Sequence, residues 1–218
     1  MSRQEKSNDT EARIVDAARQ LFLQKGYAAT SMSAIAAAAG INRPALHYYF
    51  RTKDVMFHAV AGRILQDLAP QVLAIIMRQD APISWRIERV VDVYYEMLRQ
   101  NPSLPLFVVK EMERDADAML DVMHSLRATG IFRRIASTLQ REMRAGHIRH
   151  VPLHVVVNTF YSVLIFPFLT RRLSVRLFCR PGETFDDLLN AWKPYATRQI
   201  LHLLGVEPGQ AGNEHEPS

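Results

Sequence analysis

The side chains best suited to molecular recognition lie between Gly40 and Asp54, in the stretch GINRPALHYYFRTKD. Arg43 can donate two parallel hydrogen bonds to the O6 and N7 atoms of a guanine, while the apolar surfaces of Pro44 and Ala45 can pack on a thymine methyl group. His and Tyr rings carry polar tips suited to phosphates or base edges. An ordinary surface helix would carry Ala, Leu, Glu and Lys instead. This composition favours contact with a DNA groove.

Short helices must position these side chains. One is predicted over 32–39 with Ser31 as its N-cap, and a second over 43–50 capped by Asn42. A longer amphipathic helix over about 8–25 precedes them, and the three together have the proportions of a helix-turn-helix unit. The side chains that we expect to face outward on the last helix are Asn42, Arg43, Pro44, Ala45, His47 and Tyr48.

Lys53 lies at the predicted start of the next helix. A lysine there opposes the helix macrodipole, at a cost of about 0.3–1 kcal/mol when exposed. The placement is reasonable if a phosphate docks at that helix end. Residues 1–55 hold eight Lys and Arg against five Asp and Glu, so they carry +3 of the net charge of +5. Plain helix packing and an aromatic core would explain the same pattern, so these residues alone leave both interpretations open.

The segment SMSAIAAAAGINRPALHYYFRTKDVMF, residues 31–57, resembles the DNA-binding signature of the TetR family (TetR/AcrR-like) of bacterial transcriptional regulators. The upstream pieces IVDAARQLF and KGY extend the resemblance. It implies a homodimer that binds a palindromic operator in double-stranded DNA and acts as a repressor released by a small ligand. The resemblance also implies roles for single residues: phosphate contacts from Ser31, Ser33, Tyr48 or Tyr49, and Lys53, and base contacts from Arg43, Pro44, Ala45 and His47.

The chain departs from the family pattern at three positions. The family usually has Tyr where this sequence has His47, and Gly or small polar residues where it has Pro44 and Ala45. We therefore expect the tyrosine-phosphate contact to be shifted by one position or replaced by the imidazole. The same departures leave room for an alternative function, an all-helical small-molecule-binding module whose head no longer binds DNA.

Helical periodicity continues through the rest of the 218 residues, 48% of which are hydrophobic, and strand signals are nearly absent. We predict an all-α chain of about nine helices, the later ones near 83–100, 104–115, 118–145, 152–172 and 184–204. The predicted domains are a flexible N-terminus over 1–8, a helix-turn-helix DNA-binding domain over 9–55, a ligand-binding and dimerisation domain over 56–205, and a disordered tail over 206–218.

Composition and charge narrow the class of protein. The net charge of +5 and a pI near 9.6 mildly favour anionic partners. The single Cys179 excludes a disulfide within the chain and suits a reducing compartment, so we expect a cytoplasmic protein. Residues 151–170 carry no formal charge and are long enough to span a bilayer. A buried helix that is apolar nearly all round explains them more simply, and we expect no membrane partner.

Aromatic and Met residues of the larger domain are candidates for an apolar ligand cavity, because such side chains suit adaptable binding. The same helical spacing is typical of a packed core, so both readings stay open. The family resemblance implies a small-molecule effector, which the sequence does not identify. The candidate pocket residues are Trp85, Tyr94, Tyr95, Met97, Phe107, Met112, Met123 and Phe132.

The last two predicted helices, near 152–172 and 184–204, are the natural elements of a homodimer interface. They could interdigitate in a four-helix bundle between two subunits, whereas in a monomer they would be ordinary core helices. The candidate interface residues are Phe160, Leu164, Phe168, Leu188, Trp192 and Leu203.

No enzymatic, metal or cofactor function is expected. The sequence lacks GxSxG, HExxH, P-loop and GxGxxG motifs. His147, His150 and His154 have a spacing that could gather a metal, but Pro152 interrupts it and surface imidazoles explain it better. The acidic pairs at i, i+4, such as Glu111 with Asp115, are interpreted as a solvated helix face.

Overall fold

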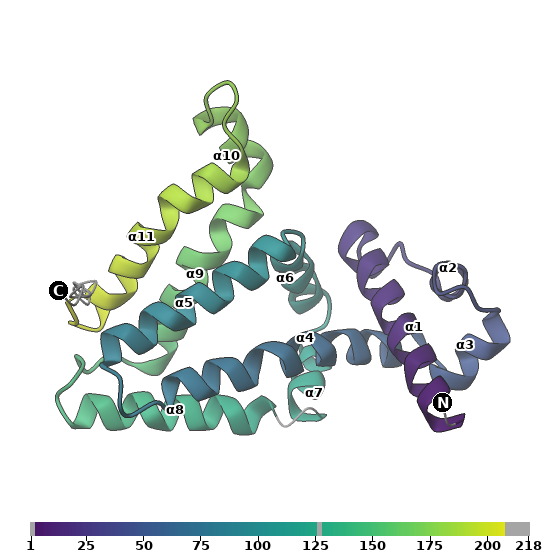
Figure 1. Cartoon of the computed structure of the whole chain (residues 1–218), viewed down its shortest axis with the longest axis horizontal. Helices are drawn as coiled ribbons and strands as arrows, with labels where there is room; N and C mark the ends of the chain where they lie inside the picture. The colour runs from purple at the N-terminus through teal and green to yellow at the C-terminus, as the bar shows by residue number, and fades with distance from the viewer. Residues whose placement is uncertain (1–2, 126–127, 208–218) are drawn as a thin grey trace, which may run out of the picture. The chain divides into compact units, whose positions relative to one another are not determined.

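The computed structural model describes residues 3–125 and 128–207, with the side chains of 3–6, 65, 67, 118, 122, 123, 125, 128 and 129 excluded. Within these ranges the chain forms helices joined by turns and loops, without a strand (Figure 1). The eleven helices are α1 Arg3–Lys25, α2 Met32–Ala38, α3 Arg43–Tyr49, α4 Lys53–Ile76, α5 Ile83–Gln100, α6 Leu104–Arg114, α7 Ala116–Ser125, α8 Ala128–Arg144, α9 Leu153–Leu169, α10 Arg171–Phe178 and α11 Phe185–Leu203.

One of the two helices beyond the predicted nine comes from a segment predicted as a single helix, and the other, α10, lies mostly between the predicted helices 152–172 and 184–204. The range 118–145 contains most of α7 and all of α8. The range 152–172 contains α9, and α10 follows it at an angle of 71°. At this bend the hydroxyl of Thr170 donates to the carbonyl oxygen of Phe166 at 3.0 Å and lies 3.0 Å from the hydroxyl of Ser174. Such local side-chain bonds compete with helix continuation.

Helix α1 begins at Arg3, within the 1–8 segment that the sequence predicts to be flexible. Its first turns read RQEKS, residues that favour helices by propensity although they show no apolar period. Apolar spacing marks only the part of a helix that packs, so the polar extension was missed. The predicted tail over 206–218 lies outside the described residues from 208 onward.

The chain divides into two compact units, Met1–Asp67 with Ser103–Thr129, and Leu68–Pro102 with Gly130–Ser218. The first unit is called the head below, and it includes α6 and α7, which the sequence had assigned to the larger domain. The ring of Phe107 on α6 stacks on Phe22 of α1, with centroids 6.2 Å apart and planes 12° apart. It also contacts Phe57 of α4 at 5.8 Å. This aromatic cluster holds α6 in the head.

Three helices of the head close around a small core. Helix α2 contacts both α1 and α3. Phe22, Ile35 and Leu46, one from each helix, are fully buried. Ala36 and Ala39 are buried as well, and their small side chains let α2 approach its neighbours closely. The orientation of α3 is therefore set by packing on its inner side.

The second unit is built around α5, α8, α9 and α11. Helix α11 packs against both α5 and α9. On α5 the buried residues recur at helical spacing and form one apolar stripe. The fully or nearly fully buried members of the core include Ile87, Val91, Tyr95, Leu98, Leu164, Phe168, Leu189, Ala196, Ile200 and Leu201.

A buried ion pair crosses this unit. Arg86 on α5 donates from Nη1 to Oε1 of Glu142 on α8 at 3.0 Å, and also to the carbonyl oxygen of Ile76 at the end of α4 at 3.1 Å. His147 donates from Nδ1 to the other carboxylate oxygen of Glu142 at 2.7 Å. Arg86 and Glu142 are each less than a tenth exposed. The pair joins three helices of the unit through charge-assisted hydrogen bonds.

By length and composition alone, α4 is the one described helix that could cross a membrane, and α9 with α10 would qualify only as a sharply bent pair. The core helix of a soluble protein passes the same test. Leu164 and Phe168 of α9 lie in the core of the second unit. These helices are therefore weak grounds for a membrane assignment.

Candidate functional site

The two short helices of the head begin at side-chain caps. The Oγ of Ser31 accepts a hydrogen bond from the backbone N–H of Ala34 at 3.1 Å. The Oδ1 of Asn42 accepts one from the N–H of Ala45 at 2.8 Å. Both caps were predicted from the sequence and are confirmed. Each satisfies a backbone donor that a helix start would otherwise leave unpaired.

The turn between α2 and α3 is held from α1. Gly40 adopts φ +67°, a left-handed conformation that ends α2. Arg13 of α1 donates from Nη2 to the carbonyl oxygen of Ala39 at 2.8 Å. The start of α3 is thus fixed to both preceding helices.

Helix α3 exposes polar and aromatic side chains to solvent. Arg43 and Pro44 are exposed, and Tyr48 is 83% exposed. Ala45 and His47 are partly buried. Leu46 and Phe50 face the core on the opposite side (4% exposed or less). The exposed side of the helix therefore carries an arginine, a proline and a tyrosine, and its opposite, apolar side packs on the core of the head.

Arg43 and His47 form a chain along the exposed side of α3. The Nε–H of Arg43 donates to Nε2 of His47 at 3.4 Å, and Nδ1 of His47 lies 3.1 Å from the carbonyl oxygen of Arg51. A carbonyl oxygen only accepts, so Nδ1 carries the imidazole proton and Nε2 is the acceptor. The bond uses one guanidinium donor and leaves the terminal amino groups for another partner.

The two adjacent tyrosines of α3 differ in their surroundings. The hydroxyl of Ser7 on α1 donates to that of Tyr49 at 3.5 Å, the limit of a hydrogen bond. The rings of Tyr48 and Tyr49 meet edge to face at 5.3 Å. Tyr49 thus faces α1, and Tyr48 is the tyrosine presented to solvent.

Lys53 is held at the start of α4. Its ammonium group donates to the carbonyl oxygen of Ala28 at 3.2 Å and lies 4.3 Å above the ring of Tyr27. The hydroxyl of Tyr27 donates to the carboxylate of Asp54. Burial and then this bond raise the pKa of Tyr27, so the phenol stays protonated. Lys53 is only partly buried, and an anion docking at this helix end would meet an ordered ammonium group.

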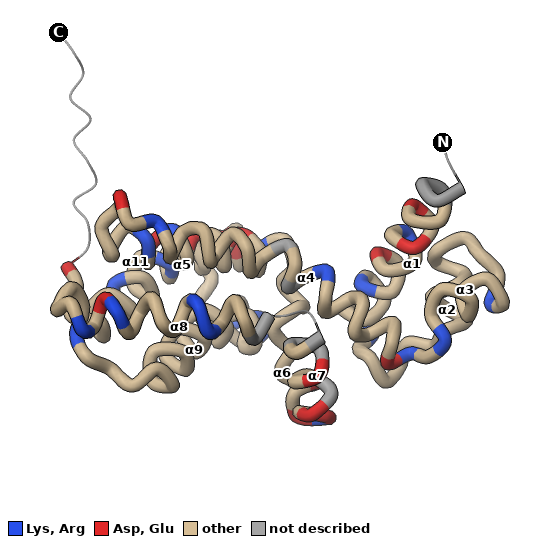
Figure 2. Tube along the Cα trace, turned by 90° about the horizontal axis from the view of Figure 1, so that it is seen from below, with Lys and Arg blue, Asp and Glu red and all other residues tan. Residues whose placement is uncertain are grey.

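The segment that contains α2 and α3 carries charge of one sign. From Gly26 to Lys53 the sequence holds Arg43, Arg51 and Lys53 and no Asp or Glu. Acidic residues of the head lie on α1, α4, α6 and α7 instead (Figure 2). Because no acidic side chain lies in the segment that contains α2 and α3, this segment is suited to binding a polyanion.

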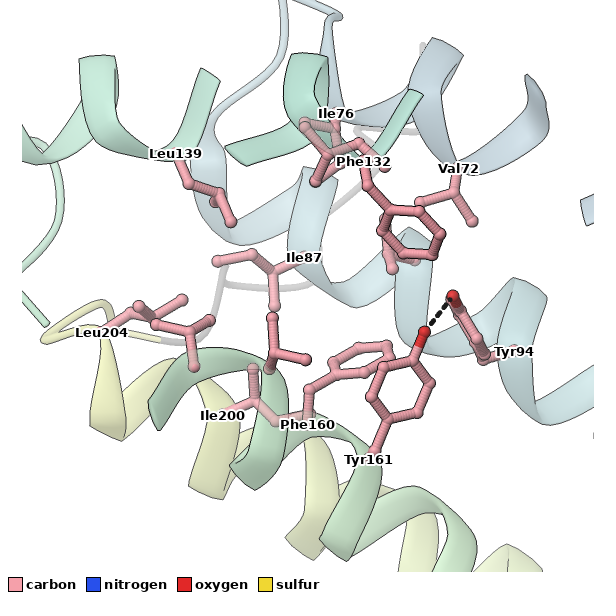
Figure 3. A pocket seen from close by; sticks show the side chains of 14 residues that line it. Val72, Ile76, Ile87, Tyr94, Phe132, Leu139, Phe160, Tyr161, Ile200 and Leu204 are labelled. Atoms are coloured by element: carbon pink, nitrogen blue, oxygen red, sulfur yellow. Dashed lines mark hydrogen bonds between the residues drawn. The ribbon is translucent and has the colours of Figure 1, made fainter. Parts of the chain in front are cut away.

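The second unit contains an apolar pocket with a cavity volume of about 120 Å³, which is partly open to solvent (Figure 3). Its polar feature is a pair of tyrosine hydroxyls, Tyr94 and Tyr161, 3.0 Å apart. Burial raises the pKa of both phenols, so both stay neutral. The residues that line the pocket are Val72, Ile76, Ile87, Val90, Tyr94, Phe132, Ile135, Leu139, Val156, Val157, Phe160, Tyr161, Ile200 and Leu204.

Known regulatory proteins resemble the N-terminal part of this chain. Residues 14–60 match the family described as bacterial regulatory proteins, tetR family. An HTH-type transcriptional regulator of Mycobacterium tuberculosis is 33% identical over 92 residues, 42% of this chain and 45% of that protein. The HTH-type transcriptional regulator RutR of Escherichia coli is 31% identical over 109 residues, half of each chain. Over residues 14–60 the chain is therefore similar to the regulatory proteins of the tetR family.

Solved structures of transcriptional regulators share the fold over most of the chain. The hemolysin II regulator HlyIIR superposes with a TM-score of 0.65 at 19% identity, covering 92% of this chain and 99% of that one. The regulator PfmR from Thermus thermophilus gives 0.61 at 21% identity, covering 85% and 97%. The chain spans only about half the length of the two sequence relatives named above.

Two of the predicted pocket residues, Tyr94 and Phe132, line the pocket. Tyr95 is buried, and its hydroxyl has no hydrogen-bond partner within the described part of the chain. The ring of Trp85 lies near the guanidinium groups of Arg78 and Arg89, at 5.0 and 5.8 Å. Met97 packs, partly buried, against the core.

The remaining pocket candidates lie elsewhere. Phe107 belongs to the aromatic cluster of the head, and Met112 on α6 is 49% exposed. The side chain of Met123 lies outside the described residues. Tyr161 was not among the pocket residues predicted from the sequence, and its neighbour Phe160 was predicted for the dimer interface. A tyrosine within an apolar helix was the available signal, because a buried hydroxyl needs a partner.

The predicted interface residues lie mainly inside the protomer. Leu164 and Phe168 are 0% and 4% exposed, so they have no surface to offer a second subunit. Trp192 donates from Nε1 to the carbonyl oxygen of Val163 at 2.9 Å. Leu188 and Leu203 pack, partly buried, on the same core. The exposed apolar residues of α9, α10 and α11 are Val157, Phe166, Leu173, Leu177, Phe178 and Tyr195.

One acidic residue departs from the predicted solvated helix face. Glu111 is buried and accepts from Nε of Arg114 at 2.6 Å. The guanidinium of Arg114 lies 4.3 Å above the ring of Tyr27, which explains why the pair packs against the head. Within the described residues no three His, Cys, Asp or Glu side chains gather into a potential metal site.

Proposed function

We propose that this protein is a cytoplasmic DNA-binding transcriptional regulator, without enzymatic activity, that represses as a homodimer from a palindromic operator. The observation that carries the proposal is the outer face of α3, where Arg43, Pro44 and Tyr48 are exposed on a packed helix. An arginine at this place can pair with guanine in the major groove, while Tyr48 reaches a phosphate. Ser31, Ser33, Asn42, Ala45, His47, Tyr49 and Lys53 complete the proposed interface.

The dimer follows from the geometry of DNA. A single short helix reads only a few base pairs, and helix-turn-helix proteins gain affinity by placing two such helices in successive major grooves, roughly 34–36 Å apart. The exposed apolar residues of α9, α10 and α11 are the surface available for a second copy, since Leu164 and Phe168 are used within the protomer. We propose that this surface joins the two subunits.

The pocket supports control by a small ligand. It is lined by aliphatic and aromatic side chains with two convergent hydroxyl groups, the composition usual for small-molecule sites. Tyr94 and Tyr161 supply its only ionisable side chains, which suits binding better than acid–base catalysis. A ligand releases the protein from DNA only if it binds the released conformation more tightly than the bound one.

The test is electrophoretic retardation of the DNA upstream of the protein's own gene by the purified full chain, with a shuffled fragment as control. Lys53 gives the proposed interface one phosphate-binding cation per head, two per dimer. With that number the affinity should fall about tenfold between about 50 and 200 mM salt. Retention of both fragments alike would contradict sequence-specific regulation. Tight ligand binding with no retained DNA would instead establish the alternative, a ligand-binding module without DNA recognition.

A further inference from the structure

The two tyrosines in the pocket are held by an aromatic cluster. The ring of Phe160 meets Tyr94 edge to face at 5.0 Å and Tyr161 at 5.5 Å. The interplanar angles are 80° and 88°. Figure 3 shows the side chains converging from α5 and α9, with the two hydroxyls facing each other. Aromatic pairs in this arrangement restrict ring orientation, so the hydroxyl groups are fixed before a ligand arrives.

One of the two hydroxyl protons of Tyr94 and Tyr161 is not used in the hydrogen bond between them. Two neutral phenols carry two protons, and one of them lies in the bond between the oxygens, 3.0 Å apart. Within the described part of the chain, neither hydroxyl has another hydrogen-bond partner. The second proton therefore points to no protein acceptor. An unpaired donor in an apolar cavity is costly, and a ligand oxygen that accepts from it would remove that cost.

The pocket offers nothing to a charged ligand. None of its lining side chains is Asp, Glu, Lys, Arg or His. The charges of Arg86 and Glu142, which do not line the pocket, are paired with each other, although Nε of Arg86 is buried without a hydrogen-bond partner in the described part of the chain. A carboxylate or ammonium group placed among these aliphatic and aromatic side chains would lose its hydration without gaining a counter-charge.

We propose that the pocket selects an uncharged, largely apolar or aromatic molecule with a single hydrogen-bond acceptor, such as a ketone or ether oxygen, placed against the hydroxyls of Tyr94 and Tyr161. The biological role of this selectivity rests on the proposed function, in which the pocket receives the effector. The chemistry of recognition rests on the pocket alone.

Three probes with one ring system test the proposal: 2-acetylnaphthalene, 2-isopropenylnaphthalene and 2-naphthoate. They differ in having a carbonyl, a methylene group of the same shape, or a carboxylate. Calorimetric titration of the full chain should show the ketone binding about fivefold more tightly than the alkene, the ratio expected for one net hydrogen bond. The carboxylate should bind at least about tenfold more weakly than the ketone.

Variants separate the hydroxyls from the shape of the pocket. In Tyr94→Phe or Tyr161→Phe one hydroxyl remains and its proton is free, so the preference for the ketone should persist. In the double variant the ketone and the alkene should bind about equally. The affinity for the alkene should stay within about twofold of the parent, which serves as the control that the pocket is intact.

Three results would overturn the proposal: naphthoate binding as tightly as the ketone, a ketone preference that survives in the double variant, or failure of all three probes to bind. None of these measurements involves DNA. A chain that prefers the ketone but retards no DNA would therefore refute the proposed regulator and leave this inference standing. A chain that retards its operator but favours naphthoate would support the proposed regulator and refute this inference about the pocket.

Discussion

Arg43 and His47 lie one turn apart on α3, and their hydrogen bond determines which donor groups of Arg43 are available for a partner such as DNA. Because His47 donates from Nδ1 to the carbonyl oxygen of Arg51, its Nε2 receives the Nε–H of Arg43. The imidazole thus orients the guanidinium, a role that the family resemblance alone did not imply. The terminal amino groups of Arg43 are the donors suited to guanine.

Replacing Arg43 by Ala should relax base choice. Each bidentate pairing with guanine discriminates by about 1–3 kcal/mol and the dimer makes two, so operator binding should weaken by roughly thirtyfold or more while binding to shuffled DNA changes little. Competition retardation with fragments altered one base pair at a time measures this. An equal loss on operator and shuffled DNA would remove Arg43 from base recognition.

Replacing Lys53 by Gln should act differently, because an ammonium at a helix start attracts any phosphate. We expect weaker binding to all sequences alike, and a salt dependence with a slope smaller by about one for each head. Lys25→Gln removes the same charge from the exposed end of α1 and should leave both quantities nearly unchanged. Thermal unfolding of each variant checks that the loss of the Tyr27 contact has not unfolded the head. Altered base preference in the Lys53 variant would contradict a purely phosphate role.

At the scale of elements, the helix-turn-helix depends on where each short helix starts and stops. Ser31 and Asn42 provide the starts, and Gly40 provides the stop with its φ of +67°. The two helices have seven residues each, too short to be stable alone. Their caps and packed faces must therefore supply the stability that isolated helices lack.

Gly40→Ala should destabilise the head by about 1 kcal/mol, because an L side chain in the left-handed region clashes with its own backbone. The new methyl group would lie 3.6 Å from Nη2 of Arg13, an ordinary contact, so backbone strain is the whole cost. The matched control is Gly130→Ala in α8, where nothing lies within 4 Å and φ is not positive. That change should stabilise by up to about 1 kcal/mol. Urea unfolding monitored by circular dichroism should show the two opposite signs. Equal effects would mean that Gly40 is not required by its conformation.

At the scale of the molecule, acid stability depends on the buried carboxylate of Glu142. Burial by itself raises its pKa, but hydrogen bonds from His147 and Arg86, with the positive charge of Arg86, outweigh burial and hold the pKa below its ordinary value. A lowered pKa means that the folded state favours the ionised group. The stabilisation is therefore present above the ordinary value of 4.5 and is lost as pH falls through the lowered pKa of the folded state.

Glu142→Gln should cost about 3–5 kcal/mol at neutral pH, because it leaves Arg86 buried without its counter-charge. The difference from the parent should shrink in acid, where the parent carboxyl is itself protonated. The double change Arg86→Met with Glu142→Leu removes both charges and should recover most of the loss. Urea unfolding between pH 3 and pH 7 measures all three chains. A double variant as unstable as the single one would show that the ion pair is not the cause.

Local signals explain why so much of the head could be predicted. The caps at Ser31 and Asn42, the stop at Gly40 and the outward face of α3 each depend on residues within a few positions of one another. Helical periodicity likewise predicts an all-α chain, since it needs no knowledge of distant residues. The start of α1 escaped prediction because its first turns are polar and show no period.

Only the tertiary structure decided which apolar residues share a space. Periodicity shows that Phe107, Leu164 and Phe168 face inward, but it does not identify the partner against which each packs. Phe107, which was predicted for the pocket, packs in the head. Leu164 and Phe168, which were predicted for the interface, are buried in the core of their own protomer. The meeting of Tyr94 with Tyr161 joins residues 67 positions apart. A hydrogen bond over such a separation has no local signal, because it exists only once two helices have packed.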